Sequence, residues 1–232
     1  GGDLITLRPE LTPSLARLVA ARQRELAFPL RWWSFGPFWR YERPQKGRTR
    51  EFFQWNIDMI GPSSPEADAE LVAVAATFLG RVGFQPGQVQ ILANDRRLMD
   101  QVLVDIGTRP EQREDVFRLI DRRDKLSPQE WEAFAIENGV SAEQLASLKQ
   151  ALDDGDLWQR SEEMRRFFRA LDALGVREWV RFDARIIRGL LYYTGTVFEA
   201  KEVARGGRSI LGGGRYDNLV QDVGGDAVSA VG

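Results

Sequence analysis

The strongest constraint on the fold is a two-residue alternation within the segment EFFQWNIDMI, residues 51–60. Successive side chains of a β-strand point to opposite faces of its sheet, so this spacing predicts a strand with two unlike faces. The apolar face carries Phe53, Trp55, Ile57 and Met59, and the other face carries Phe52, Gln54, Asn56 and Asp58. We expect the apolar face, including Phe53, to lie against the core.

A second strand is expected over residues 31–42, which would pair antiparallel with the first through the loop 43–50. Arg40 and Glu42 are two residues apart and would share a face, so they can lie beside the polar row of the returning strand. A sheet face of this kind offers an arginine that can bind a phosphate, a glutamate that can accept from an amino group and an aromatic ring that can stack on a base. The loop is basic and could cover a polyphosphate; the alternative is a solvated charged loop with no binding role. Its basic residues are Arg43, Lys46, Arg48 and Arg50.

Helical patterns flank this hairpin. Thr12-Pro13 predicts an N-cap and first turn for a helix over residues 12–27, and a second helix is expected over residues 65–82. Residues 89–94 predict a short strand. From 96 to 174 the chain is almost wholly helix-forming and includes two capping boxes, SPQE (127–130) and SAEQ (141–144).

Strand patterns return after residue 175, in the segments 176–189 and 192–203, followed by a glycine-rich bend at 212–217. We expect these strands to complete the first sheet. The resulting organisation is a first sheet part over residues 1–95, a helical insertion over 96–174 and a second sheet part over 175–232. The fold class is therefore α/β, of the α+β type.

Composition excludes several kinds of chemistry. The 232 residues contain no cysteine and no histidine, so disulfides, thiolate metal sites, cysteine nucleophiles and histidine bases are all ruled out for this sequence. The formal net charge of -2 argues against general nucleic-acid binding. No apolar run is long enough to span a bilayer and no signal segment opens the sequence, so we expect a cytoplasmic location and no membrane partner.

Four segments together resemble the signature stretches of histidyl-tRNA synthetases, a family of class II aminoacyl-tRNA synthetases, and they occur in the family's order. They are LRPELTP (7–13), FWRYERPQKGRTREF (38–52), RGLLYYTGTVFE (188–199) and GGGRYDNL (212–219). The second resembles the motif 2 hairpin of these enzymes. The resemblance implies an antiparallel class II synthetase sheet flanked by helices, with an all-helical insertion that in relatives approaches the tRNA acceptor stem.

The same resemblance implies an activity: formation of histidyl-adenylate from histidine and ATP with Mg2+, then transfer of histidine to the acceptor end of tRNA(His). Full-length relatives are expected to be homodimers. In the nucleotide site it implies that Arg40 contacts the α-phosphate, Glu42 accepts from the adenine amino group and Phe52 stacks on the ring. Arg48 would reach the outer phosphates. Arg188 would act beside the substrate carboxylate and α-phosphate, partly in place of a metal ion.

For histidine, the resemblance implies that Glu10, Gln54 and Asp58 hold the α-ammonium and the imidazole, together with Thr12. Tyrosines would wall the pocket: Tyr192, Tyr193 and Tyr216. Because Tyr192 and Tyr193 are adjacent, one of them is expected to pack in the core instead. No protein metal ligands are predicted, since the aspartates at 153, 154 and 156 fit a helix–helix turn. The alternative for Arg188 is an ordinary ion pair with Asp183 or Glu199.

Three departures from the family pattern affect the expected activity. Phe53 stands where relatives usually have His, and Leu191 stands where they commonly have Asp or a small residue. Motif 1, motif 3 and the anticodon-binding domain have no counterpart in these 232 residues, so weak aminoacylation by this segment is expected. The alternative function is a non-catalytic paralogue that senses histidine, such as the regulatory subunit of ATP phosphoribosyltransferase. A plain RNA-binding module fits poorly, because no basic face is interleaved with aromatic residues.

Overall fold

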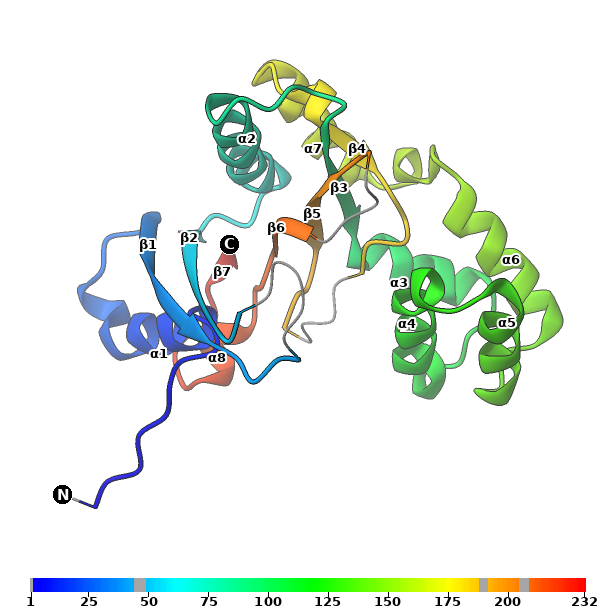
Figure 1. Ribbon diagram of the computed structural model, residues 1–232, viewed down its shortest axis with the longest axis horizontal. Helices are drawn as coiled ribbons and strands as arrows, with labels where there is room; N and C mark the ends of the chain where they lie inside the picture. Colours follow the sequence, from blue (N-terminus) through cyan, green and yellow to red (C-terminus); the bar gives the residue numbers. More distant parts are fainter. Residues whose placement is uncertain (1, 44–48, 188–191, 205–208) are drawn as a thin grey trace. The chain divides into compact units, whose positions relative to one another are not determined.

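The computed structural model describes residues 2–43, 49–187, 192–204 and 209–232 (Figure 1). The chain divides into two compact units. The first comprises Gly1–Ser63 and Tyr216–Gly232, and the second comprises Ser64–Arg215. These boundaries follow the density of contacts, whereas the predicted division at 95/96 and 174/175 follows composition and remains a prediction.

The first unit is built on a three-stranded antiparallel sheet in the order β1-β2-β7, with strands β1 (Leu30–Trp39), β2 (Glu51–Gly61) and β7 (Ser229–Val231). The predicted hairpin is confirmed, because Phe38 lies opposite Phe52 and Trp32 opposite Asp58. Directly opposed residues share a face, so the polar row of β2 continues onto β1. Helices α1 (Thr12–Arg22) and α8 (Leu219–Asp222) contact each other beside this sheet (Figure 1).

The prediction that Phe53 faces the core is wrong. The alternation along β2 is as expected, but the aromatic side chains on the Phe53 face are solvent-exposed: Trp33 70%, Phe35 64%, Phe53 63% and Trp55 44%. Phe35 and Phe53 stack on each other at a centroid distance of 5.4 Å. Alternation separates two faces but does not say which one another element will cover. Phe38, on the face with the polar row, is the fully buried aromatic residue.

The second unit contains a four-stranded sheet in the order β4-β3-β5-β6, with strands β3 (Val89–Asp95), β4 (Val180–Phe182), β5 (Thr196–Glu202) and β6 (Ser209–Gly214). The expectation that the later strands complete the first sheet is therefore wrong for β4, β5 and β6; β7 alone joins β1 and β2 among the described strands. β3 and β4 are parallel. Parallel neighbours need a long crossover, and the helical residues between them supply it.

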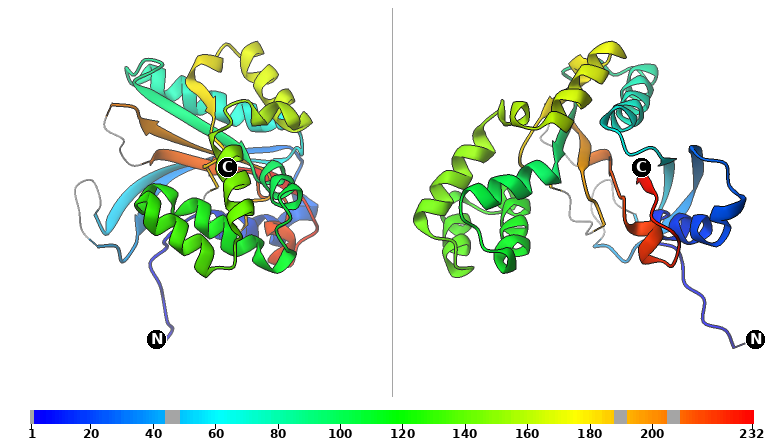
Figure 2. Two further views of the ribbon diagram at one scale, coloured as in Figure 1. Left: turned by 90° about the vertical axis from the view of Figure 1, so that its right-hand side faces the viewer. Right: turned by 180° about the vertical axis from the view of Figure 1, so that it is seen from behind.

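Six helices of the described chain belong to this unit: α2 (Pro65–Arg81), α3 (Arg96–Asp105), α4 (Arg113–Asp121), α5 (Pro128–Glu137), α6 (Ala142–Asp153) and α7 (Glu162–Ala173). Helices α2 and α7 pack side by side in all three views (Figures 1 and 2). Both predicted capping boxes are confirmed, at Ser127 with Glu130 and at Ser141 with Gln144. No helix in the described ranges is long and apolar enough to cross a membrane.

Two local predictions need correction. Thr12 does not cap α1, because the helix begins at Thr12 itself and the capping position falls on Leu11, whose side chain cannot accept a hydrogen bond. Among residues 176–187, which the structure describes, the expected strand is confined to β4, and Arg177–Trp179 form a 3-10 turn before it. In both cases the predicted type of element, a helix and a strand, was correct, and the predicted boundaries were wrong.

Candidate functional site

The end of the β1–β2 hairpin gathers three of the four residues predicted to bind nucleotide. The Arg40 guanidinium carbon lies 4.9 Å from the centroid of the Phe52 ring, and Arg40 Nη1 lies 4.0 Å from Glu42 Oε1. All three side chains are partly accessible to solvent. A cation, a carboxylate and an aromatic face are therefore adjacent at one end of the sheet. Arg48 lies outside the described residues.

The segment leading into α1 runs alongside this hairpin end. The Trp39 amide donates to the Arg8 carbonyl at 3.0 Å, and Arg40 Nε donates to the Pro9 carbonyl at 2.8 Å. Arg8 and Pro9 are thus both hydrogen-bonded to the hairpin. Glu10, which is half-buried, follows them directly in the sequence. Thr12, also half-buried, is the first residue of α1.

At the other end of the same sheet face, Asp58 is buried at 4% exposure. Tyr216 Oη, on a side chain that is 2% exposed, donates to Asp58 Oδ1 at 2.6 Å. Burial raises the pKa of Asp58 to about 6, and the hydrogen bond from Tyr216 partly opposes that rise. Two residues predicted to bind histidine thus form a buried acid–phenol pair. At pH 7 and above the carboxyl is mostly ionised, with no cation among the causes of its pKa shift.

Asp58 also lines a hollow of about 320 Å³ between α1 and β1. Its lining is mainly apolar and consists of Leu11, Ser14, Leu15, Leu18, Trp32, Trp33, Ser34 and Asp58. A largely apolar hollow with a few polar groups is typical of small-ligand sites, and this volume falls at the lower end of their range. Glu10, Thr12 and Gln54 are not among its lining residues, although Gln54 lies on the same sheet face as Asp58.

Asn56 is a polar residue of this face for which no specific role was predicted. It lies between Gln54 and Asp58 on β2, opposite Ser34, and its Nδ2 atom is buried with no hydrogen-bond partner in the described part of the chain. Buried amide donors are nearly always satisfied in folded proteins, so this exception calls for an acceptor from a ligand or water. Its place in the alternating polar row was the signal that pointed to it.

Tyr192 and Tyr193 belong to the second unit. Their rings meet edge to face at a centroid distance of 5.0 Å, with Tyr193 buried and Tyr192 half-buried. The prediction that one of them packs in the core is therefore confirmed for Tyr193. A Cβ at Gly214 would lie 2.8 Å from Tyr193 Cδ1, so the last glycine of the GGG run permits this packing. That run forms the end of β6.

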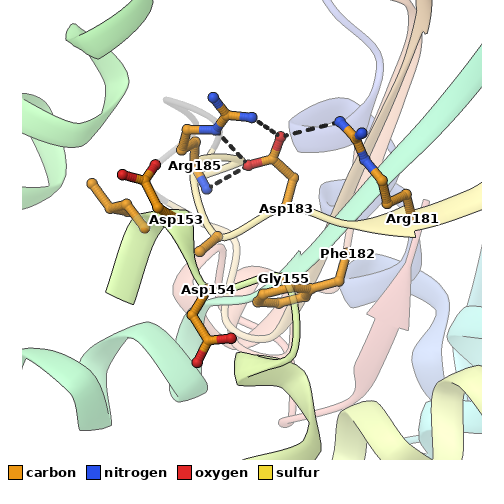
Figure 3. A pocket seen from close by; sticks show the side chains of 9 residues that line it. Asp153, Asp154, Gly155, Arg181, Phe182, Asp183 and Arg185 are labelled. Carbon is orange, nitrogen blue, oxygen red and sulfur yellow. Dashed lines mark hydrogen bonds and ion pairs between the residues drawn. The ribbon is translucent and has the colours of Figure 1, made fainter. Parts of the chain in front are cut away.

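Arg188 lies outside the described residues, but the two carboxylates proposed as its alternative partners are both paired. Asp183 accepts a fork from Arg185, with Nε–Oδ1 and Nη2–Oδ2 both at 2.8 Å, and Arg181 lies 3.9 Å away (Figure 3). Burial favours the neutral acid, but these hydrogen bonds prevail and hold the pKa of Asp183 below its ordinary value. Glu199 pairs with Lys201 at 2.5 Å.

The hollow in Figure 3, about 290 Å³, lies between this arginine–aspartate fork and the turn after α6. Asp153, the last residue of α6, and Asp154, its C-cap, border it. The prediction of a helix–helix turn thus holds for Asp154, whereas Asp153 still belongs to the helix. Asp153 pairs with Arg123 at 3.0 Å. Within the described ranges, no group of three or more acidic residues is arranged to hold a metal ion.

Comparison with known proteins gives a consistent result. The family model described as histidyl-tRNA synthetase matches residues 1–232. The chain is 37% identical to the chloroplastic/mitochondrial histidine–tRNA ligase of Arabidopsis thaliana, over all of this chain and 50% of that protein. It is 38% identical to the histidine–tRNA ligase of Picrophilus torridus, over all of this chain and 57% of that protein. The chain thus spans about half the length of these curated relatives.

Solved structures share the fold. Histidyl-tRNA synthetase from Nostoc superposes with a TM-score of 0.82 at 24% identity, covering 97% of this chain and 56% of that one. A Bacillus halodurans protein, described as an ATP phosphoribosyltransferase regulatory subunit/histidyl-tRNA synthetase, superposes with a TM-score of 0.81 at 24% identity, covering 97% and 61%. At this identity the superpositions establish the class II synthetase fold alone. The family match over the full length carries the assignment: the chain belongs to the histidyl-tRNA synthetase family.

Proposed function

We propose that this chain is part of the catalytic region of a histidine–tRNA ligase, which activates histidine with ATP and transfers it to tRNA(His). The observation that carries the proposal is the arrangement along one face of the β1–β2 hairpin. A cation, a carboxylate and an aromatic ring lie at one end, at Arg40, Glu42 and Phe52. A buried acid–phenol pair, Asp58 with Tyr216, lies at the other.

In the proposed activation step, a carboxylate oxygen of histidine attacks the α-phosphorus of ATP. The bond from that phosphorus to the bridging oxygen of the β-phosphate breaks, and pyrophosphate leaves. Negative charge grows on the α-phosphate oxygens during this displacement, and a guanidinium held beside them stabilises it. Arg40 is suited to this role because Pro9 fixes its Nε, which leaves its orientation set before nucleotide binds.

No histidine or cysteine is needed for this chemistry, because the substrate carboxylate is itself the nucleophile. Mg2+ would enter with the ATP phosphates and neutralise charge on the leaving pyrophosphate. In the second step a terminal ribose hydroxyl of tRNA attacks the carbonyl carbon, and AMP leaves. The chain's own residues therefore have to position substrates and neutralise charge, and the hairpin end offers groups suited to both tasks.

Recognition of histidine is proposed to centre on Asp58. The ionised carboxylate can accept a hydrogen bond from an imidazole N–H, and the bond would be charge-assisted. Since burial raises the pKa of Asp58, a partner that carries a donor into the site relieves an unfavourable charge. The Tyr216 hydroxyl keeps one carboxylate oxygen oriented, which leaves the other for the ligand.

A second candidate is supported by the Bacillus halodurans neighbour, whose description names a regulatory subunit of ATP phosphoribosyltransferase beside the synthetase. A histidine-sensing paralogue would need the Asp58 end of the face but not the nucleotide end. The presence of Arg40, Glu42 and Phe52 together favours the ligase.

The test is histidine-dependent exchange of pyrophosphate into ATP by the complete polypeptide. We expect exchange with histidine, none without it, and loss on Arg188→Ala. Arg181→Ala is the matched control, because Arg181 is an exposed arginine of the same unit whose partner Asp183 retains Arg185. Histidine binding without any exchange would favour the sensing paralogue, and absence of both would contradict the proposal.

A further inference from the structure

Arg8, which no expectation assigned a role, lies on the same face of the hairpin as the predicted substrate residues. Its guanidinium carbon is 4.4 Å from the centroid of the Phe38 ring, and Phe38 in turn stacks with Phe52 at 6.3 Å. Arg8 thus covers the buried aromatic residue next to the ring predicted to bind adenine. The side chain extends over Gly36, where a Cβ would stand 2.5 Å from Arg8 Nη2. The Arg8 guanidinium can lie here because Gly36 has no side chain.

Arg8 is bonded to β1 through both its main chain and its side chain. Its carbonyl accepts from the Trp39 amide at 3.0 Å, and its Nε donates to the Pro37 carbonyl at 2.9 Å. One residue later, the Pro9 carbonyl accepts from Arg40 Nε at 2.8 Å. Three hydrogen bonds within two residues fix this segment on the edge of the sheet.

Side-chain hydrogen bonds run in both directions between the segment and the hairpin. Arg8 reaches from the segment to the strand, and Arg40 reaches from the end of the strand back to the segment. Each guanidinium also lies against an aromatic ring of the hairpin, Arg8 against Phe38 and Arg40 against Phe52. Glu10 follows Pro9 directly, so its position depends on these bonds.

We propose that Arg8 is a positioning residue that makes nucleotide binding and histidine binding favour each other, by fixing residues 8–10 on β1. The inference rests on the proposed function, in which Arg40 engages the α-phosphate and Glu10 the histidine ammonium. A phosphate that fixes Arg40 also fixes its bond to the Pro9 carbonyl, and that bond restrains the adjacent Glu10. Binding of either substrate thereby lowers the conformational entropy of residues 8–10, so the second substrate loses less entropy when it binds. The effect is reciprocal, as coupling between two equilibrium sites must be.

The experiment measures histidine affinity by calorimetry, using the complete polypeptide with and without α,β-methylene-ATP and Mg2+. This nucleotide cannot be cleaved between its α- and β-phosphorus atoms, so no adenylate forms. The readout is the ratio of the two histidine dissociation constants. We expect a ratio of at least about 5 for the natural protein, which is the lower end of ordinary coupling between sites. Arg8→Met keeps much of the stem over Phe38 and loses the bond to the Pro37 carbonyl, so it should lower the ratio clearly toward one.

Arg22→Met is the matched control, because Arg22 lies in the same unit and its exposed guanidinium bonds to Glu25, three residues further along the chain, at 3.0 Å. It should keep the natural ratio. Arg8→Gln is a second variant in case Arg8→Met does not fold, and it should also lose the coupling. Arg8→Lys should restore it in part, since lysine keeps the charge but not the fixed fork of donors.

The possible results distinguish a failure of the coupling role of Arg8 from a failure of the proposed ligase function. A folded Arg8→Met protein that keeps the natural ratio would overturn the inference alone. So would a natural protein that binds both ligands with a ratio of one. If the natural protein binds neither histidine nor the nucleotide, the proposed function fails and the coupling fails with it. A fall in histidine affinity with an unchanged ratio would mark Arg8 as merely structural.

Discussion

Two buried aspartates, Asp58 in the first unit and Asp68 in the second, have hydrogen-bond partners of very different kinds. Asp68 of α2 accepts two bonds from Arg215, at 2.5 and 3.1 Å, and a third from Thr196 Oγ1 at 2.7 Å. Asp58 of β2 accepts from the neutral Tyr216 hydroxyl. The first carboxylate has an opposite charge beside it. Within the described residues the second accepts from a phenol and no cation, which suits a carboxylate whose further partner is a ligand.

Two asparagines, Asn94 in the second unit and the half-buried Asn56 in the first, repeat the contrast. Asn94 of β3 donates to the carbonyls of Ala184 and Ile186, at 3.0 and 3.1 Å, and accepts from the Asp95 amide at 2.8 Å. Asn56 of β2 has a buried Nδ2 atom with no partner in the described residues. Asn94 is thus satisfied within its own unit, whereas Asn56 keeps an unused donor among the described residues. A ligand or an ordered water can complete such a bond.

The largest expected effect comes from breaking the charged pair. Arg215→Met should destabilise the fold by about 3–5 kcal/mol, because it removes the cation that is hydrogen-bonded to the buried Asp68 carboxylate. Denaturant unfolding measures this loss. The matched control is Arg166→Met, which removes an equivalent fork to Glu66 on the same helix, at 2.8 and 2.7 Å, but at an exposed site. Equal losses for the two variants would contradict the role of burial.

The opposite sign is expected at Asp58. The folded-state pKa of about 6 exceeds the ordinary value of 3.8. The free energy of unfolding should therefore fall as the pH rises from 3.8 to about 6 and stay at the lower value above that range, where the carboxyl is ionised in both states. Asp58→Asn should therefore stabilise the protein at pH 7, by up to about 3 kcal/mol. The advantage should shrink as the pH falls from 7 through 6 toward 4, where the natural carboxyl becomes protonated in the folded state. Unfolding free energies of both proteins across that range provide the test, and a pH-independent difference would refute it.

The smallest effect compares the two asparagines. Asn56→Leu should stabilise the fold by about 1 kcal/mol, since a nearly isosteric side chain removes a buried donor that has no acceptor. Asn94→Leu should destabilise it by about 1–3 kcal/mol, because two carbonyls and an amide then lose their partner. Thermal unfolding of the pair measures both signs. Destabilisation by Asn56→Leu as large as that by Asn94→Leu would show that the first site is also satisfied internally.

Much of this site could be predicted from sequence where the signals are local. The alternation along residues 51–60 placed Phe52, Gln54 and Asp58 on one face, as β2 has them. It also separated Phe53 correctly onto the other face but wrongly assigned that face to the core, because coverage depends on segments distant in the chain. Asn56 was visible as a member of the row, whereas its missing partner was not. Arg8 gave no signal, since its value depends on Gly36 and Phe38 lying beneath it.

The sequence by itself determined the helix starts at Ser127 and Ser141, the hairpin and its two faces, and the motifs of the family. These depend on interactions between residues a few positions apart or on short recognisable segments. Only the tertiary structure decided which polar groups are buried and what they meet. Asp58 is 158 residues from Tyr216, and Asp68 is 147 residues from Arg215. Partners so distant are chosen by packing, because burial makes an unmet charge or donor costly and no local pattern records where the chain will return.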